Sequence, residues 1–191
     1  MPARTLGRAF DNLPLDPESW REMLTDLVQI RMLGDKKRDE NFRFRRFMKS
    51  HYHSDRILRR IAEGIQEQID CTQCANCCKS STTHVTERDL DRLARHLRIS
   101  PEQVRATYTQ PDEEEGGHNL KFTQGAGCVF LEGNLCSVYD ARPDICQRYP
   151  HLVRGNGSIA SRMWSFVDRA SICPIVYNSL EAFKEELRFR R

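Results

Sequence analysis

The feature that most constrains this chain is the segment CTQCANCC (71–78), which places four cysteines within eight positions. Four more cysteines follow, Cys128, Cys136, Cys146 and Cys173. Thiolates are soft ligands that suit zinc, Cu(I) and iron–sulfur clusters. A C-x2-C spacing also lets one tight loop present two sulfurs to one metal. The segment therefore predicts a fold in which metal centres pin the loops between secondary-structure elements.

The composition favours metal chemistry over disulfide bonds. The chain has a formal net charge of +3 in 191 residues, 30% charged residues and a mean hydropathy of −0.65. The longest apolar runs are far shorter than the ~20 residues that span a bilayer, and the N-terminal segment does not read as a signal peptide. We therefore expect a cytoplasmic protein, in which cysteines stay reduced and more often bind metals than form disulfides.

Cys77 and Cys78 are adjacent in the sequence, and this limits how they can bind the same metal ion. Their Cα atoms are about 3.8 Å apart, and in extended chain their side chains would point to opposite faces. We therefore expect them to serve two different metals, or different atoms of one cluster. Each tetrahedral metal centre takes four ligands, so eight thiols would be enough for two centres.

One partition of the thiols follows the order of the chain. The first centre would use Cys71, Cys74 and Cys77 together with Cys173, and the second would use Cys78, Cys128, Cys136 and Cys146. An exchange of Cys77 with Cys78 fits the sequence equally well. The alternative is that some cysteines are small buried apolar residues, and this alternative is stronger for Cys173 alone than for the 71–78 cluster.

The remaining sequence predicts a mainly α (α+β) small metal-stapled domain, with several short helices and one short β-hairpin. A helix begins at Asp16 and Pro17, and another follows Ser54 with its apolar face inward. Thr86 caps a third helix, and a Ser100…Gln103 capping box with Pro101 begins a fourth. Short helical segments are expected between Pro143 and Pro150 and after Asn178 or Ser179.

The hairpin prediction rests on CVFLEGNLCSVY (128–139), in which two apolar runs surround a Glu-Gly-Asn turn. It would put Cys128 and Cys136 on neighbouring strands. For the whole chain, we expect residues 1–67 to form an N-terminal helical segment that packs on the core. Residues 68–191 would form the cysteine-cluster metal-binding domain.

Residues 36–60 form a basic stretch, with ten Lys or Arg against three Asp or Glu. Phe42, Phe44 and Phe47 are interspersed, and basic plus aromatic side chains are typical of single-stranded nucleic-acid binding. The whole chain lacks the basic excess of most nucleic-acid-binding domains. We therefore favour an amphipathic segment with its phenylalanines packed inward, and we expect the metal ion as partner, with no membrane and no nucleic acid.

The cysteine segments resemble a known family. CTQCANCC and GCVFLEGNLCSVYDARPDICQRYP (127–150) are similar to the cysteine-cluster family described as zinc- or iron-chelating proteins (CxxCxxCC, YkgJ-type). The matching positions are Cys71, Cys74, Cys77, Cys78, Cys128, Cys136, Tyr139, Arg142, Pro143, Cys146, Pro150 and Cys173. The resemblance covers roughly residues 68–175. It implies metal chelation by zinc or iron and no established reaction.

Other side chains are candidates to surround the metal ligands. A centre of four thiolates is negatively charged, and Arg142, which flanks Cys146, could offset this charge or lower thiol pKa values. Arg148 is a second candidate, and Tyr139 belongs to the matching motif. His84 and His151 lie near cysteines in the sequence and could replace a thiolate.

Three classes of function remain open. The first is a metal-binding protein with a structural or stored ion. The second is an iron–sulfur protein in electron transfer or redox sensing. The third is a metal-dependent enzyme, methyltransferase-like or a hydrolase. We favour a non-enzymatic protein, because eight cysteines fill two closed sites whereas a catalytic zinc keeps an open position. No Ser–His–Asp or paired-carboxylate pattern stands out.

Overall fold

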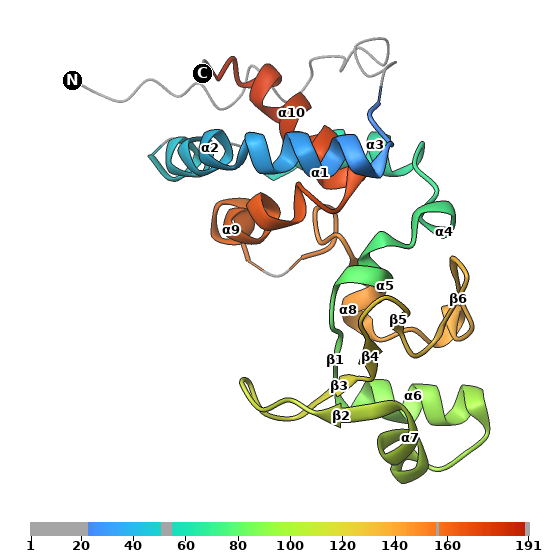
Figure 1. Cartoon of the computed structure of the whole chain (residues 1–191). Helices are drawn as coiled ribbons and strands as arrows, with labels where there is room; N and C mark the ends of the chain where they lie inside the picture. The colour runs from blue at the N-terminus through green and yellow to red at the C-terminus, as the bar shows by residue number, and fades with distance from the viewer. Residues whose placement is uncertain (1–22, 51–54, 156, 190–191) are drawn as a thin grey trace. The chain divides into compact units, whose positions relative to one another are not determined.

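The computed structural model describes residues 23–50, 55–155 and 157–189 (Figure 1). The chain forms two compact units. The first, here called the helical unit, consists of Met1–Ile69 and Pro150–Arg191. The second, the cysteine unit, consists of Asp70–Tyr149. The residues after 150 therefore pack with the N-terminal helices, although the sequence places them after the cysteine segments.

Five helices make up the described part of the helical unit. They are α1 (Leu27–Lys36), α2 (Arg38–Ser50), α3 (Asp55–Gln66), α9 (Ile159–Arg169) and α10 (Pro174–Glu186). Helix α10 packs against α3 and α1, and α2 packs against α9. The apolar face of α3 is buried as the sequence predicts, by Ile57, Leu58, Ile61, Ala62 and Ile65.

Two helix starts differ from the predicted ones. The predicted start at Asp16 lies outside the described residues, but residues 23–26 are not helical and α1 begins only at Leu27. Asp26 caps α1, since its carboxylate accepts a hydrogen bond from the Gln29 backbone N–H at 2.8 Å. Helix α10 begins at Pro174 rather than after Asn178 or Ser179. Proline suits the first helical position, because that N–H has no partner within a helix.

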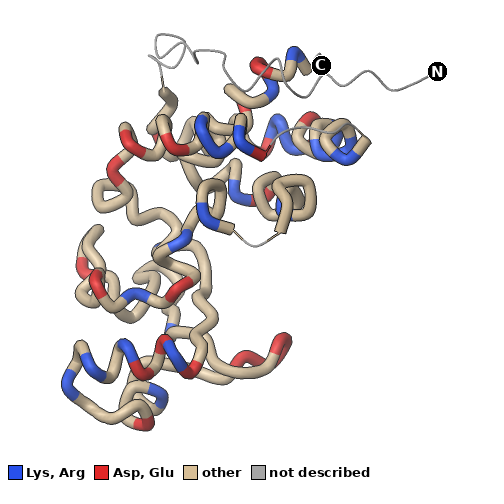
Figure 2. Tube along the Cα trace, turned by 180° about the vertical axis from the view of Figure 1, so that it is seen from behind, with Lys and Arg blue, Asp and Glu red and all other residues tan. Residues whose placement is uncertain are grey.

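Helix α2 carries the basic stretch and is amphipathic. Phe44 is fully buried, with its ring centroid 5.6 Å from that of Phe183 on α10, whereas Arg43, Arg46 and Lys49 are exposed. Figure 2 shows both signs of charge along the helices. The inward packing of Phe44 is the arrangement that the amphipathic interpretation predicts.

A buried lysine joins α2 to α10. Lys184 is only 5% exposed, and its Nζ lies 2.8 Å from Glu40 Oε1 and 2.6 Å from Glu181 Oε1. A buried ammonium would be costly without such partners. Two carboxylates from two helices therefore fix how α10 lies against α2.

The cysteine unit consists of short elements. Its helices are α4 (Cys71–Cys74), α5 (Asn76–Ser80), α6 (Glu87–Leu97), α7 (Pro101–Tyr108), the 3-10 turn η2 (Tyr139–Ala141) and α8 (Asp144–Arg148). Its strands are β1 (His84–Val85), β2 (Thr109–Pro111), β3 (His118–Leu120), β4 (Phe122–Thr123), β5 (Gly127–Cys128), β6 (Leu131–Glu132) and β7 (Leu135–Cys136). The capping predictions at Thr86 and Ser100 are confirmed, since both residues form capping boxes.

The strands form three small antiparallel sheets, in the orders β1-β3-β2, β4-β5 and β6-β7. The mainly α fold class is confirmed. The predicted hairpin exists as β6-β7, with Leu131 opposite Cys136. Cys128, however, lies on β5 opposite Phe122 of β4. The prediction that Cys128 and Cys136 occupy neighbouring strands is therefore wrong, because the chain turns once more between them.

One small apolar core supports these elements. Its buried members are Val85, Leu90, Leu93, Ala94, Val104, Leu120, Phe130, Val138 and Ala141. Cys128 and Cys136 are partly buried and pack against this cluster. The core therefore forms one wall of the region in which the cysteines lie.

Replacing Phe44 tests the core of the helical unit. Phe44→Ala should cost about 3–5 kcal/mol of unfolding free energy, as large buried aromatic truncations do. Phe42→Ala is the matched control, because Phe42 is only half-buried. Urea unfolding followed by circular dichroism measures both. Equal losses in the two variants would contradict the inward packing of Phe44.

Candidate metal centre

Four cysteines lie on two consecutive helical turns. Cys71 and Cys74 begin and end α4, which is capped by the Asp70 carboxylate through a 2.8 Å hydrogen bond from the Thr72 backbone N–H. Ala75 then adopts a left-handed conformation with φ 48° and separates α4 from α5. This turn allows two short helices to follow each other directly. The C-x2-C spacing thus corresponds to one turn of helix, in which residues three apart share a face.

Cys77 and Cys78 both lie within α5, so the extended geometry expected for them is wrong. Their sulfurs are 3.9 Å apart and form a hydrogen bond. Two sulfurs bound to one tetrahedral zinc at about 2.3 Å would lie about 3.8 Å apart. The two adjacent thiols are therefore placed to share one ion or to bind two neighbouring ions.

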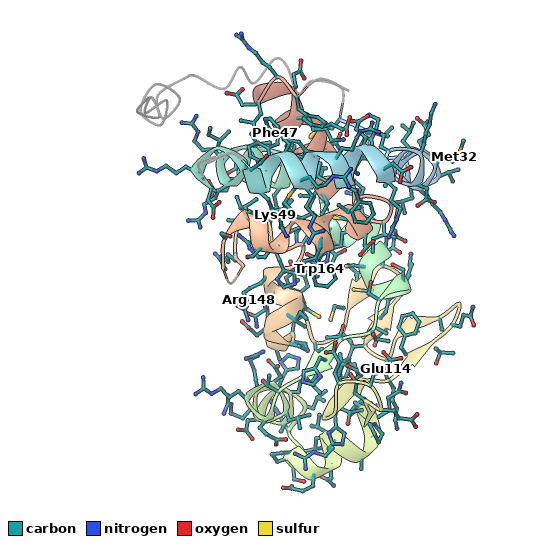
Figure 3. The ribbon with its side chains drawn as sticks, turned by 90° about the vertical axis from the view of Figure 1, so that its left-hand side faces the viewer. Met32, Phe47, Lys49, Glu114, Arg148 and Trp164 are labelled. Atoms are coloured by element: carbon teal, nitrogen blue, oxygen red, sulfur yellow. The ribbon has the colours of Figure 1, made fainter. Side chains whose placement is uncertain are left out.

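Cys78 belongs to a group of four thiols from four elements, here called the four-thiol group: Cys78 on α5, Cys128 on β5, Cys136 on β7 and Cys146 on α8. Burial raises the pKa of the Cys128 and Cys136 thiols and raises that of Cys146 to about 11. The neighbouring thiols contribute to these raised pKa values, and such an interaction links every pair within the group. Yellow sulfur atoms gather beside the helical turn that carries Arg148 (Figure 3).

Cys78 differs from its three neighbours. Its pKa is lowered to about 7, chiefly by the hydrogen bond with Cys77, and the positive charges of Arg142 and Lys79 add to this effect. Cys71 has a raised pKa, first because of burial and then because of the nearby Cys74. Cys78 also contributes to the raised pKa of Cys71. Cys78 is therefore electrostatically linked to thiols on both sides of it.

Arg142 supplies positive charge to the thiols. Its guanidinium lies 3.5 Å from the centre of the Tyr139 ring, and its charge acts to lower the pKa of Cys71, Cys78 and Cys136, against the larger effect of burial at Cys71 and Cys136. Arg142 Nε is buried, and no residue in the described part of the chain accepts a hydrogen bond from it. Arg148 instead forms an ion pair with Asp144 within α8. Arg142 is therefore a cation that acts on three of the cysteines.

Sequence reasoning missed two side chains that hold the cysteine segments together. Asn134 in the β6-β7 turn donates to the Gln73 carbonyl at 3.0 Å and accepts from Lys79 Nζ at 2.5 Å. It thereby ties the hairpin that carries Cys136 to α4 and α5. Asp89 of α6 accepts a hydrogen bond from the Asp144 backbone N–H at 2.9 Å. Neither contact has a local sequence signal, because the partners are more than 50 residues apart.

Cys173 belongs to the helical unit. It precedes α10 in the helical unit and is 7% exposed. The cysteine unit thus contains the other seven cysteines. The candidate ligand His84 lies exposed on β1.

The donor set fits a thiophilic ion. All eight cysteines lie among the described residues, and none forms a disulfide. Within residues 23–50, 55–155 and 157–189, no group of three or more His, Cys, Asp or Glu side chains has an arrangement that could hold a metal ion as it stands. Metal ligation requires thiols to lose their protons. Binding of an ion by the four-thiol group would therefore require deprotonation of its thiols.

No helix in the described ranges combines the length and the apolar character that crossing a membrane requires.

The contact between β5 and α5 offers a direct test of this geometry. A Cβ at Gly127, where φ is +88°, would lie 2.7 Å from the Cys78 carbonyl oxygen. At Gly125, where φ is +87°, a Cβ would meet nothing within 4 Å. Both Gly→Ala variants should pay about 1–2 kcal/mol for the left-handed backbone. Gly127→Ala should lower the thermal midpoint clearly further, and equal midpoints would contradict the contact between β5 and α5.

Comparison with known proteins agrees with this donor set. A family model, CxxCxxCC, described as "putative zinc- or iron-chelating domain", matches residues 70–174, which is more than half of the chain and includes all eight cysteines. Searches of curated proteins and of solved structures find no match. The predicted resemblance is confirmed: the chain belongs to the CxxCxxCC family of zinc- or iron-chelating domains.

Proposed function

We propose that this protein holds zinc or iron in thiolate centres built from its eight cysteines, and that the metal is mainly structural. The observation that carries the proposal is the four-thiol group, in which every pair of thiols interacts. Four half-buried thiols that interact with one another would repel as thiolates. A bound cation converts this repulsion into attraction and thereby favours the deprotonated thiols.

The proposed second centre is the four-thiol group itself, Cys78, Cys128, Cys136 and Cys146. The proposed first centre uses Cys71, Cys74 and Cys77. The placement of Cys71 and Cys74 on one helical turn supports their sharing an ion. The 3.9 Å separation of the Cys77 and Cys78 sulfurs supports two centres that meet at α5.

Arg142 has the role of counter-ion in this proposal. Zinc with four thiolates carries a net negative charge, and a nearby guanidinium stabilises it. The buried Nε of Arg142 would donate its hydrogen bond to a ligand sulfur. The Tyr139 ring would hold the guanidinium in place through the cation–π contact.

We propose zinc ahead of an iron–sulfur cluster. Eight thiols supply the four ligands of each of two closed zinc sites. A cytoplasmic setting is part of the proposal, since thiols stay reduced and available for metal binding in a reducing compartment.

Metal analysis combined with a serine scan tests the two centres. Anaerobically purified protein should contain about two zinc ions per chain, as expected for closed four-thiolate sites. A Cys→Ser substitution at any position of the four-thiol group should lower the zinc content by one ion per chain. Cys71→Ser or Cys74→Ser should remove the other zinc ion. Each set of variants serves as the control for the other. Stoichiometric iron and sulfide would favour the iron–sulfur alternative, and metal-free protein with reactive thiols would exclude both.

Metal removal tests the structural role. Structural zinc contributes about 10–16 kcal/mol in small peptides, which matches or exceeds the ~5–15 kcal/mol net stability of a domain. A strong chelator should therefore abolish hydrogen-exchange protection across Asp70–Tyr149. Amides of α3 provide the internal control, because the apolar core of the helical unit protects them. Unchanged protection in the cysteine unit after complete metal removal would contradict a structural metal.

A further inference from the structure

The turn that carries Arg142 and leads to Cys146 is held by one helix outside the metal centre. Arg92 of α6 donates from Nη2 to the Arg142 carbonyl at 2.7 Å and from Nε to the Ala141 carbonyl at 3.3 Å. The same Nη2 lies 2.5 Å from Asp89 Oδ1. One guanidinium thus fixes two consecutive carbonyls of this turn and is itself held by a carboxylate.

Asp89 completes the arrangement from the other side. It is 2% exposed, and its Oδ1 accepts from the Asp144 backbone N–H at 2.9 Å. Its Oδ2 accepts from the Thr86 backbone N–H at 2.9 Å and from the Thr86 hydroxyl at 2.7 Å. A buried carboxylate with several donors is strongly oriented. Asp89 is therefore a fixed point against which the start of α8 is placed.

Helix α8 needs this external support. It has only five residues, and the residue before it, Pro143, makes no side-chain cap. An isolated helix of this length is not stable in water. The Asp89 carboxylate takes the place of the missing cap, two residues before Cys146. The position of the Cys146 sulfur, and that of the Arg142 side chain, therefore depends on α6.

We propose that Asp89 and Arg92 are positioning residues for the metal centre, which set its affinity by fixing Cys146 and Arg142. The proposal rests on the proposed function, since it assumes that Cys146 binds metal. Metal–sulfur distances tolerate only about 0.2 Å of displacement. Loss of a hydrogen-bonding partner outside the ligands typically lowers metal affinity 10–100-fold.

The test compares matched substitutions on the two faces of α6. Asp89→Asn and Arg92→Gln remove the network, and Asp91→Asn and Arg95→Gln make the same chemical changes at exposed positions. Zinc affinity is measured on the full chain by competition with a chromophoric chelator. We expect zinc affinity to fall 10–100-fold in the first pair of variants and to stay unchanged in the second pair. The absorption of the Co(II)-substituted protein should change in the first pair only.

Arg92→Lys tests whether the hydrogen-bonding geometry of the guanidinium or only its positive charge is required. Lysine keeps the positive charge but cannot reach two carbonyls with a planar fork. We expect it to lose zinc affinity as Arg92→Gln does. Full affinity in Arg92→Lys would overturn the positioning role of the guanidinium.

Combining Asp89→Asn with each of two Cys→Ser substitutions tests whether its effect on zinc affinity arises only from a general loss of stability. In Cys146→Ser the four-thiol group is already broken, so Asp89→Asn should have no further effect on the remaining zinc. In Cys71→Ser the four-thiol group persists, so Asp89→Asn should keep its full effect. Such non-additivity is expected only between residues that act together, and an equal effect in both backgrounds would overturn the proposal.

The failure of this proposal differs from the failure of the proposed function. If the unmodified chain binds zinc tightly and Asp89→Asn and Arg92→Gln match their controls, the positioning role is wrong and the metal function stands. If the unmodified chain binds neither zinc nor iron, the metal function fails and the positioning role fails with it.

Discussion

The cost of deprotonating half-buried, neighbouring thiols is the constraint on which the cysteine unit depends. Cys78, Cys128, Cys136 and Cys146 come from four different short elements and interact pairwise. Burial, together with the neighbouring thiols, raises the pKa of Cys146 to about 11, which shows how poorly its surroundings solvate a thiolate. Elements of two to five residues have little stability of their own. What holds them must come from outside them, and a cation shared by the thiols satisfies both requirements.

The helical unit is stabilised in a different way. Its helices bury apolar faces, as α3 does, and Phe44 and Phe183 meet at the contact of α2 with α10. Lys184 adds specificity, because its buried ammonium requires Glu40 and Glu181 in fixed positions. A buried ion pair contributes little net stability but disfavours other packings. One unit thus depends on apolar burial, and the other combines a small core with polar contacts among loops.

The sequence predicted what is decided locally. The caps at Thr86 and Ser100 are each specified within four residues, and both form as predicted. The apolar face of α3 follows from its own periodicity. Predictions based on distant partners were less successful: the chain pairs Cys128 with Phe122, which no local pattern indicates. The helical conformation at Cys77 and Cys78 was missed because it depends on the left-handed turn at Ala75, a residue with no special preference for that conformation.

The same distinction explains why the cysteines were found from the sequence and their supports were not. Thiols are identified by their chemistry at any position, whereas Asp89 and Arg92 are ordinary helix residues until their partners are known. Their partners lie about 50 residues away, at Ala141, Arg142 and Asp144. A metal centre made from short elements needs supports of this kind, because its ligands cannot position themselves. In this fold, a regular helix with strong local caps provides the fixed frame for α8, which lacks a cap of its own.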